Sequence, residues 1–202
     1  VAVVKVYRSR GGDLPGLEAG VYQYGTQDEA LRCLRHGDFR GTLVEAASQD
    51  PSVAHAPVSI VCTSTFWRNA WKYQARAYRH TFWDNGTILA NMLALASAHS
   101  LPSKVVMGFV DEVVNSLLGI DGQKEAAISL VPLGYSSSPS AWPSPTVDNL
   151  TVATVPPSKM EVDYPAIRYI HNASALINPS EVSRWIWKQT PSPPQGPDMD
   201  TI

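Results

Sequence analysis

The chain has 202 residues, of which 44% are hydrophobic and 17% charged, so it has room for one globular domain and a tail. Its formal net charge of −2 gives no electrostatic reason to expect a nucleic-acid partner, which requires a basic face. No apolar run approaches the roughly 20 residues that span a bilayer, and we expect no membrane segment.

The first part of the chain predicts a strand pair followed by two helices. The valine-rich run 1–7 and the segment 20–24 are expected strands that pair antiparallel. A short helix is expected over 28–37, where Asp28 opens the segment and leucines recur. Residues 39–47 predict another helix, with an apolar face.

The middle of the chain is expected to organise the fold. The apolar run 57–63 predicts a central strand covered on both faces. The stretch 68–108 then reads as a basic and aromatic loop, a core helix that packs on two sides, and a strand that ends at residue 108. Asp84 is the expected N-cap of that core helix.

The last predicted core elements are a helix that Asp111 caps and Gly119 ends, and a strand over 125–133. Together these elements predict an α+β fold in which helices flank a central, mainly antiparallel sheet.

The composition changes near residue 135, where a Pro/Ser-rich segment begins. We therefore expect one domain over 1–135, then a linker and tail over 136–202. Short helices are expected around 164–176 and 180–187, and the end of the chain is expected to be disordered.

The chain contains none of the common catalytic or nucleotide-binding motifs, and its five histidines lack metal-ligand spacing. We expect no metal site. His80 and Asp84 are four residues apart and could form an acid/base pair, but a helix-start cap beside an imidazole is the simpler interpretation. Cys33 and Cys62 also lack metal spacing, and without a signal-peptide pattern a reduced, cytoplasmic setting is expected.

A basic and aromatic cluster carries the strongest indication of chemistry. Five cationic or phenolic residues fall within twelve positions: Arg68, Lys72, Tyr73, Arg76 and Arg79. Five large aromatic residues are interleaved with them or lie just before or after them: Trp67, Trp71, Tyr78, Phe82 and Trp83. Aromatic faces stack on planar rings and guanidinium groups bind phosphates, so the cluster favours a nucleotide-like or flavin-like cofactor. A solvated face and an aromatic subunit interface are the alternatives.

The order of several short motifs adds a family resemblance. The segment KYQARAYRHTFWDNGTILANMLALASAHSL, followed by VVMGF, LLGI and VPLG, resembles the SagB-type dehydrogenases. These form a branch of the flavin-dependent nitroreductase superfamily that includes thiazoline and oxazoline oxidases. The resemblance covers residues 1–135, about two thirds of the chain, and it implies a nitroreductase-like fold.

The resemblance also implies site residues and a cofactor, FMN. Lys72 and Tyr73 match the pair that azoline-oxidising members need for catalysis, in which loss of a substrate proton accompanies electron transfer to the flavin. The implied cofactor-binding residues are Arg76, Met107, Gly108 and Gly134. The Met107-Gly108 backbone would lie against the flavin ring, because a glycine allows close approach, and Gly134 would lie near the phosphate.

The implied function is two-electron dehydrogenation, of the azoline-to-azole type, of an organic or peptide substrate by a homodimer or an intrachain pseudo-dimer. The family's N-terminal R-S-x-R element, which holds the FMN phosphate, does not precede the first strand, and the chain starts at Val1. We therefore expect an N-terminally incomplete domain of a longer protein. One alternative is a catalytically degenerate half-domain that serves as the structural partner of an active flavin domain. Another is a plain NAD(P)H-dependent nitroreductase, which would tolerate loss of Tyr73.

Overall fold

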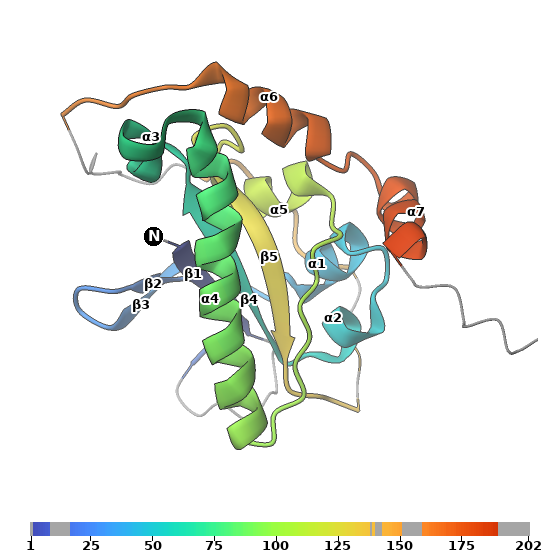
Figure 1. Ribbon diagram of the computed structural model, residues 1–202. Helices are drawn as coiled ribbons and strands as arrows, with labels where there is room; N and C mark the ends of the chain where they lie inside the picture. Colours follow the sequence, from blue (N-terminus) through green and yellow to red (C-terminus); the bar gives the residue numbers. More distant parts are fainter. Residues whose placement is uncertain (1, 9–16, 138, 140–142, 151–158, 190–202) are drawn as a thin grey trace, which may run out of the picture.

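A computed structural model describes residues 2–8, 17–137, 139, 143–150 and 159–189 (Figure 1). These residues form a five-stranded sheet with the order β3-β2-β1-β4-β5, in which every neighbouring pair is antiparallel. The strands are β1 (Ala2–Arg8), β2 (Gly20–Gly25), β3 (Ala30–His36), β4 (Val58–Thr65) and β5 (Glu125–Leu133). The expected α+β fold with a mainly antiparallel sheet is confirmed, as is the inner position of β4.

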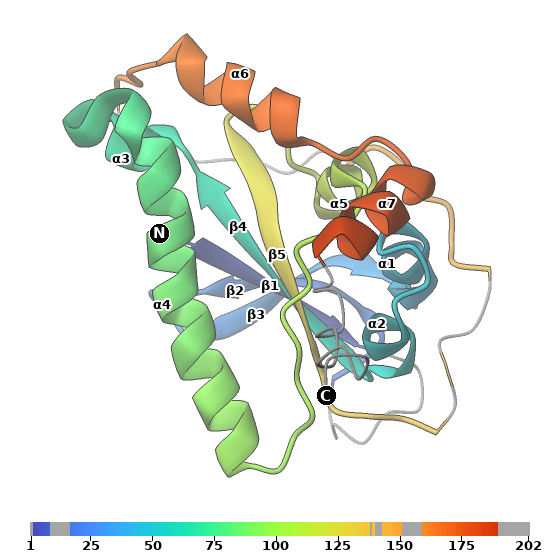
Figure 2. The ribbon, with the colours of Figure 1, turned by 45° about the vertical axis from the view of Figure 1, so that its right-hand side comes forward.

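Helices cover both faces of this sheet. They are α1 (Arg40–Ala46), α2 (Pro51–His55), α3 (Trp67–Tyr73), the 3-10 turn η1 (Gln74–Arg76), α4 (Ala77–Ala98), α5 (Asp111–Leu118), α6 (Pro165–Ser174) and α7 (Pro179–Gln189). The long helix α4 lies on one face, and α1, α2, α5 and α7 lie on the other (Figure 2). No helix among the residues described has the length and apolar character needed to cross a membrane.

A β-bulge in β5 fixes how α4 sits on the sheet. Thr63 pairs with Ala127 and Cys62 with Ser129, so Ile128 is an extra residue on its strand. As a result both Ile128 and Ser129 face α4, where the Asn85 side-chain amide donates to Ser129 Oγ at 3.0 Å. This buried polar pair anchors the middle of α4 to the sheet.

The helix expected over 28–37 is wrong, because this segment is strand β3. A turn at 26–29, in which Glu29 has a φ of 51°, reverses the chain and pairs β3 with β2. Leu31 and Leu34 suggested a helix by their spacing, yet β3 is a largely exposed edge strand. Backbone pairing with β2 therefore outweighs the local pattern.

The expected start of the core helix is also wrong. The basic and aromatic segment is helical as α3, and α4 begins at Ala77, so Asp84 lies inside the helix. The Asp84 carboxylate accepts instead from the Asn69 amide at 3.2 Å, which joins α4 to α3. Asp111 likewise is the first residue of α5 rather than its cap, and its carboxylate accepts from the Leu176 N–H at 2.8 Å. Gly119 does end α5, with a φ of 68°.

The expectation that the core helix packs on two sides is not met within one chain. The buried residues of α4 form a single stripe: Ala77, Thr81, Asn85, Leu89 and Ala96. Leu95 is 62% exposed, and Phe82 and Trp83 also point outward. The part of α4 that the sheet does not cover therefore exposes several large apolar side chains, spread around the helix.

The segment after α4 is extended but does not form the expected strand. Ser103 and Val106 make isolated bridges to Leu133 and Leu130 of β5. Pro102 lacks an N–H and cannot donate to a ladder, and Val106 and Leu130 exchange a reciprocal pair of backbone hydrogen bonds at 2.9 Å each. The segment thus runs along the outer edge of β5 toward Met107 and Gly108.

The two short helices expected after residue 135 are present as α6 and α7, and both pack on the domain. Ile167 of α6 is buried, and Val182 of α7 is fully buried in the main core. The remaining tail positions 151–158 and 190–202 lie outside the described residues, so the expected disorder at the end stays a prediction, as does the domain boundary.

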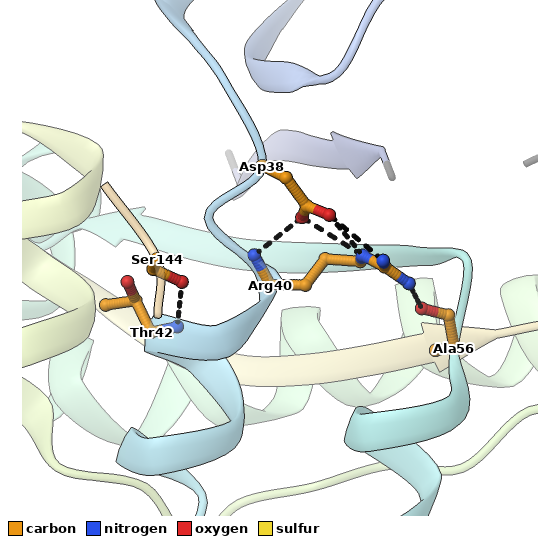
Figure 3. Close-up of polar contacts among 5 residues, drawn as sticks. All are labelled: Asp38, Arg40, Thr42, Ala56 and Ser144. Carbon is orange, nitrogen blue, oxygen red and sulfur yellow. Dashed lines mark hydrogen bonds and ion pairs between the residues drawn. The ribbon is translucent and has the colours of Figure 1, made fainter. Parts of the chain in front are cut away.

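A buried ion pair holds the start of α1 (Figure 3). The Asp38 carboxylate accepts from the Arg40 backbone N–H at 3.1 Å and from its Nε and Nη2 at 3.0 Å each. Arg40 Nη1 also donates to the Ala56 carbonyl at 3.4 Å, beyond the end of α2. The Arg40 side chain is 8% exposed, so its charge depends on Asp38.

Helix α6 carries a buried histidine whose protonation should loosen the fold. His171 is 6% exposed, and its ring lies 5.1 Å from the Phe66 ring, with Nδ1 at 3.3 Å from the Tyr78 hydroxyl. Burial lowers the pKa of His171. The unfolded chain, with a histidine pKa of about 6.5, therefore binds the proton first as the pH falls. The buried neutral ring therefore contributes to the free energy of unfolding above about pH 6.5, and this contribution is lost as the pH falls below that value.

We expect the free energy of unfolding to fall between pH 7 and pH 5 in the wild type and to fall less in His171→Gln, whose neutral amide keeps a polar partner for Tyr78. Urea unfolding at several pH values measures this, with His99→Gln, at the exposed end of α4, as the control. Equal pH dependence in the wild type and in His171→Gln would contradict the assignment.

Candidate functional site

Lys72 and Tyr73 lie at the exposed corner where α3 meets α4. The Tyr73 ring stacks on His80, with centroids 4.1 Å apart, and Lys72 Nζ lies 5.2 Å from the Tyr73 ring centroid. Trp83 meets His80 edge-on at 5.0 Å. The ammonium and the phenol are therefore both at the surface, and the imidazole of the next helix orients the phenol.

The backbone turns sharply directly after this pair. Gln74 has φ 54° and ψ −141°, a backbone conformation that residues other than glycine rarely adopt. This strained residue ends α3 and begins η1, so Lys72 and Tyr73 lie directly before a bend in the backbone. Sequence reasoning missed Gln74 and considered His80 only beside Asp84, since the bend depends on how α3 docks.

The basic and aromatic cluster divides between two surfaces. Tyr78 points inward to the Phe66 and His171 rings, and burial raises the pKa of its phenol. Arg79 lies over the exposed Trp83 ring at 4.9 Å, a cation–π contact. Arg76 is exposed in η1. His80 contacts Tyr73 rather than forming the acid/base pair considered with Asp84.

Met107 and Gly108 lie elsewhere, in a groove between α7 and the extended segment that follows α4 and runs along the edge of β5. The groove has a volume of about 250 Å³ and is lined by Asp50, Lys104, Val105, Val106, Met107, Gly108, Trp185 and Ile186. Lys104 Nζ donates to Asp50 Oδ2 at 2.8 Å across its floor. Burial raises the pKa of Asp50, but hydrogen bonds from Lys104 and Ser52 outweigh it and leave that pKa below its usual value.

A planar ring fits this groove only if one side chain moves. Gly108 has no side chain and Met107 is partly exposed, which suits close approach of a flat ligand to the backbone. A Cβ at Gly108, however, would lie 3.0 Å from Trp185 Cε3, so the indole already covers this face. Lys104 is paired with Asp50 and supplies no free charge to a phosphate.

Gly134 lies at the end of β5, apart from both places. Its N–H donates to the Pro102 carbonyl at 2.8 Å and its φ is 77°, a region that favours glycine. A Cβ there would lie 3.0 Å from the Pro57 ring. In one copy of the chain the predicted site residues thus occupy three places, and no groove found among the described residues contains both Lys72 and Gly108.

A second groove, of about 230 Å³, lies between α3 and α6 and was not anticipated from sequence. Its aromatic lining comes from Phe66, Trp67 and Tyr164. Its charged residues pair with each other, as Lys124 with Glu161 and Arg168 with Asp163, both at 2.8 Å. Over the ranges that the structure describes, no three His, Cys, Asp or Glu side chains gather as a metal site requires.

Comparison with known proteins shows which family has this fold and these segments. Residues 17–135 match the Nitroreductase family. The candidate nitroreductase MJ1384 of Methanocaldococcus jannaschii is 25% identical over 122 residues, which cover 60% of this chain and 60% of that protein. The trifolitoxin-processing protein TfxB of Rhizobium leguminosarum bv. trifolii is 28% identical over 130 residues, which cover 62% of this chain and 35% of TfxB.

Solved structures agree with this assignment. A candidate nitroreductase from Anabaena variabilis is 32% identical, with a TM-score of 0.67 over 87% of this chain and 35% of that one. The Escherichia coli microcin synthetase McbBCD complex, solved with truncated pro-MccB17 bound, contains a chain with the same fold. That chain is 18% identical, with a TM-score of 0.59 over 68% of this chain and 52% of its own length. The present chain therefore spans about a third to three fifths of these relatives.

Proposed function

Because this chain belongs to the nitroreductase family of oxidoreductases, we propose that it is part of an FMN-dependent enzyme that dehydrogenates an azoline in a peptide substrate. The observation that carries the proposal is the Lys72–Tyr73 pair. It is exposed beside a strained bend, and the Tyr73 ring stacks on His80. The sequence resemblance matches it to the catalytic pair of azoline-oxidising family members.

The chain's own part in this reaction is to bind, orient and move a proton. In its neutral amine form, Lys72 accepts through Nζ the proton that leaves the azoline ring, and the Tyr73 hydroxyl relays that proton toward solvent. Met107 and Gly108 would hold the flat ring through their backbone, and Arg76 would supply charge for the phosphate. FMN, when bound, supplies the acceptor for the two electrons and the hydrogen that leave with them.

The peptide substrate is proposed from a relative rather than from a pocket. TfxB, as its name says, processes trifolitoxin, and it shares 28% identity with this chain over 130 residues. An exposed catalytic corner suits a peptide, because a chain can reach Lys72 without entering a closed cavity.

A second nitroreductase-like unit completes the proposed site, either as a second copy of the chain or as another half of a longer protein. Two observations support it. The groove that contains Gly108 is not lined by Lys72, and the part of α4 that the sheet leaves uncovered exposes Phe82, Trp83 and Leu95. Apolar side chains of this kind are typical of an obligate interface.

A second candidate function is a catalytically degenerate half-domain that supports an active flavin domain. The position of Trp185 on Gly108 favours it, because the indole occupies the face that a flavin ring would need. In this case the chain would contribute the α4 surface and no chemistry.

Flavin content tests the proposed function. We expect the intact protein that contains this chain to purify with visible flavin absorbance and to release FMN on denaturation. Gel filtration should place the flavin in a species with two nitroreductase-like units. Intact protein that is colourless, and that remains so after FMN is added, would contradict the proposal.

A further inference from the structure

The most specific feature of the groove is the contact between Gly108 and Trp185. A Cβ built at Gly108 would meet Trp185 Cε3 at 3.0 Å, Trp185 Cζ3 at 3.2 Å and Ile186 Cγ1 at 3.2 Å. These contacts are closer than ordinary packing between carbon atoms, about 3.5–4.0 Å. The absence of a side chain at Gly108 is therefore what lets the indole lie where it does.

Helix α7 is fixed at one end and open at the other. Val182 is fully buried in the main core, and the Ser183 hydroxyl contacts the Ser48 hydroxyl. Trp185, further along the helix, is 37% exposed at the rim of the groove. The indole can swing into solvent by a change of rotamer while Val182 keeps the helix in place.

On the side of Gly108 toward which a side chain would point, the indole leaves no room for a second flat ring. A ring stacked there needs a layer of about 3.5 Å, and the indole fills that layer. A ligand that lies on this side of Gly108 must therefore displace Trp185, and its apparent affinity is then reduced in proportion to the fraction of molecules in which the indole has moved away.

We propose that Trp185 is a gating residue, which closes the Gly108 face in the ligand-free chain and swings away to admit the flat ring of the cofactor. The inference rests on the proposed function, since it takes FMN as the ligand of the Gly108 face. It accounts for an aromatic side chain on a glycine that the family resemblance assigns to the flavin.

Titration with FMN tests the gate. The intact protein is freed of flavin, and the quenching of FMN fluorescence gives its dissociation constant for the wild type, Trp185→Ala, Trp185→Phe and Trp187→Ala. Closed states of proteins commonly leave about 0.1–10% of molecules open, so Trp185→Ala should bind FMN about tenfold tighter or more. Trp185→Phe should show a smaller gain. Trp187 is 79% exposed on the same helix and does not line the groove, so its alanine variant should match the wild type.

The outcomes separate the gate from the proposed function. Equal or weaker FMN binding by Trp185→Ala than by the wild type overturns the gate, and the proposed function stands because FMN still binds. Failure of the wild type and of every variant to bind FMN overturns both. If circular dichroism shows that Trp185→Ala does not fold, Trp185→Phe decides: tighter binding supports the gate, and unchanged or weaker binding overturns it.

Discussion

Replacing Lys72 with alanine should lower turnover of an azoline peptide at least about 100-fold, because a positioned acid or base contributes about 10²–10⁴-fold. Bound flavin should be unchanged, since Lys72 lies on the exposed face of α3 and outside the Met107–Gly108 groove. Steady-state kinetics on the intact protein measures the loss, with flavin content recorded for each sample.

Lys159→Ala is a suitable control, because Lys159 is also an exposed lysine and lies in a different part of the chain. Unchanged turnover in Lys72→Ala would contradict catalysis by this residue and favour the degenerate half-domain. Tyr73→Phe separates the remaining alternative. An azoline oxidase should lose activity with the phenol, whereas a plain NAD(P)H-dependent nitroreductase should tolerate its loss.

The largest effect on stability should come from Asp38. Changing Asp38 to alanine leaves the Arg40 charge, with its side chain 8% exposed, without a counter-ion, and should lower the free energy of unfolding by about 3–5 kcal/mol. This is a large share of the roughly 5–15 kcal/mol that stabilises a domain. Denaturant unfolding at neutral pH measures the change.

Two comparisons make the Asp38 experiment specific. Asp28→Ala removes the partner of Arg32 in an exposed pair, with side chains 53% and 48% exposed, and should cost less than about 0.5 kcal/mol. Adding Arg40→Met to Asp38→Ala should recover part of the loss, because the buried charge is then removed. A cost below about 1 kcal/mol for Asp38→Ala would contradict the account of this pair.

Much of the fold follows from local patterns. The valine-rich and apolar runs became β1, β4 and β5, and the helix that ends at Gly119 is present because a glycine accepts the left-handed φ of a helix end. Helix α2 could also have been found. Asp50 followed by Pro51 is an N-cap and first-turn signal, and the Asp50 carboxylate does accept from the Ser52 N–H at 2.8 Å.

The errors arise where distant segments decide the structure. Leu31 and Leu34 have helical spacing, but pairing with β2 makes their segment a strand. Asp84 looks like a cap, but the packing of Tyr78 against Phe66 and His171 draws the preceding turn into α4. Local secondary-structure propensity carries no information about contacts between segments that are distant in the sequence.

The candidate site shows the same division. The sequence pattern identified Lys72, Tyr73 and Gly108 as residues to examine, and their proposed roles still await experiment. It could not place Trp185 on Gly108 or His80 on Tyr73, because each contact joins separate elements through the packing of α7 or α4. The sequence also could not show that the groove at Gly108 lacks Lys72 from its lining.

The most direct test of the account is an anaerobic reaction of the intact, flavin-loaded protein with an azoline-containing peptide. The account predicts that the visible absorbance of the flavin is bleached as the peptide loses two hydrogen atoms, and that Lys72→Ala slows both changes together. Flavin that stays oxidised beside an unchanged peptide, in protein shown to carry FMN, would contradict it.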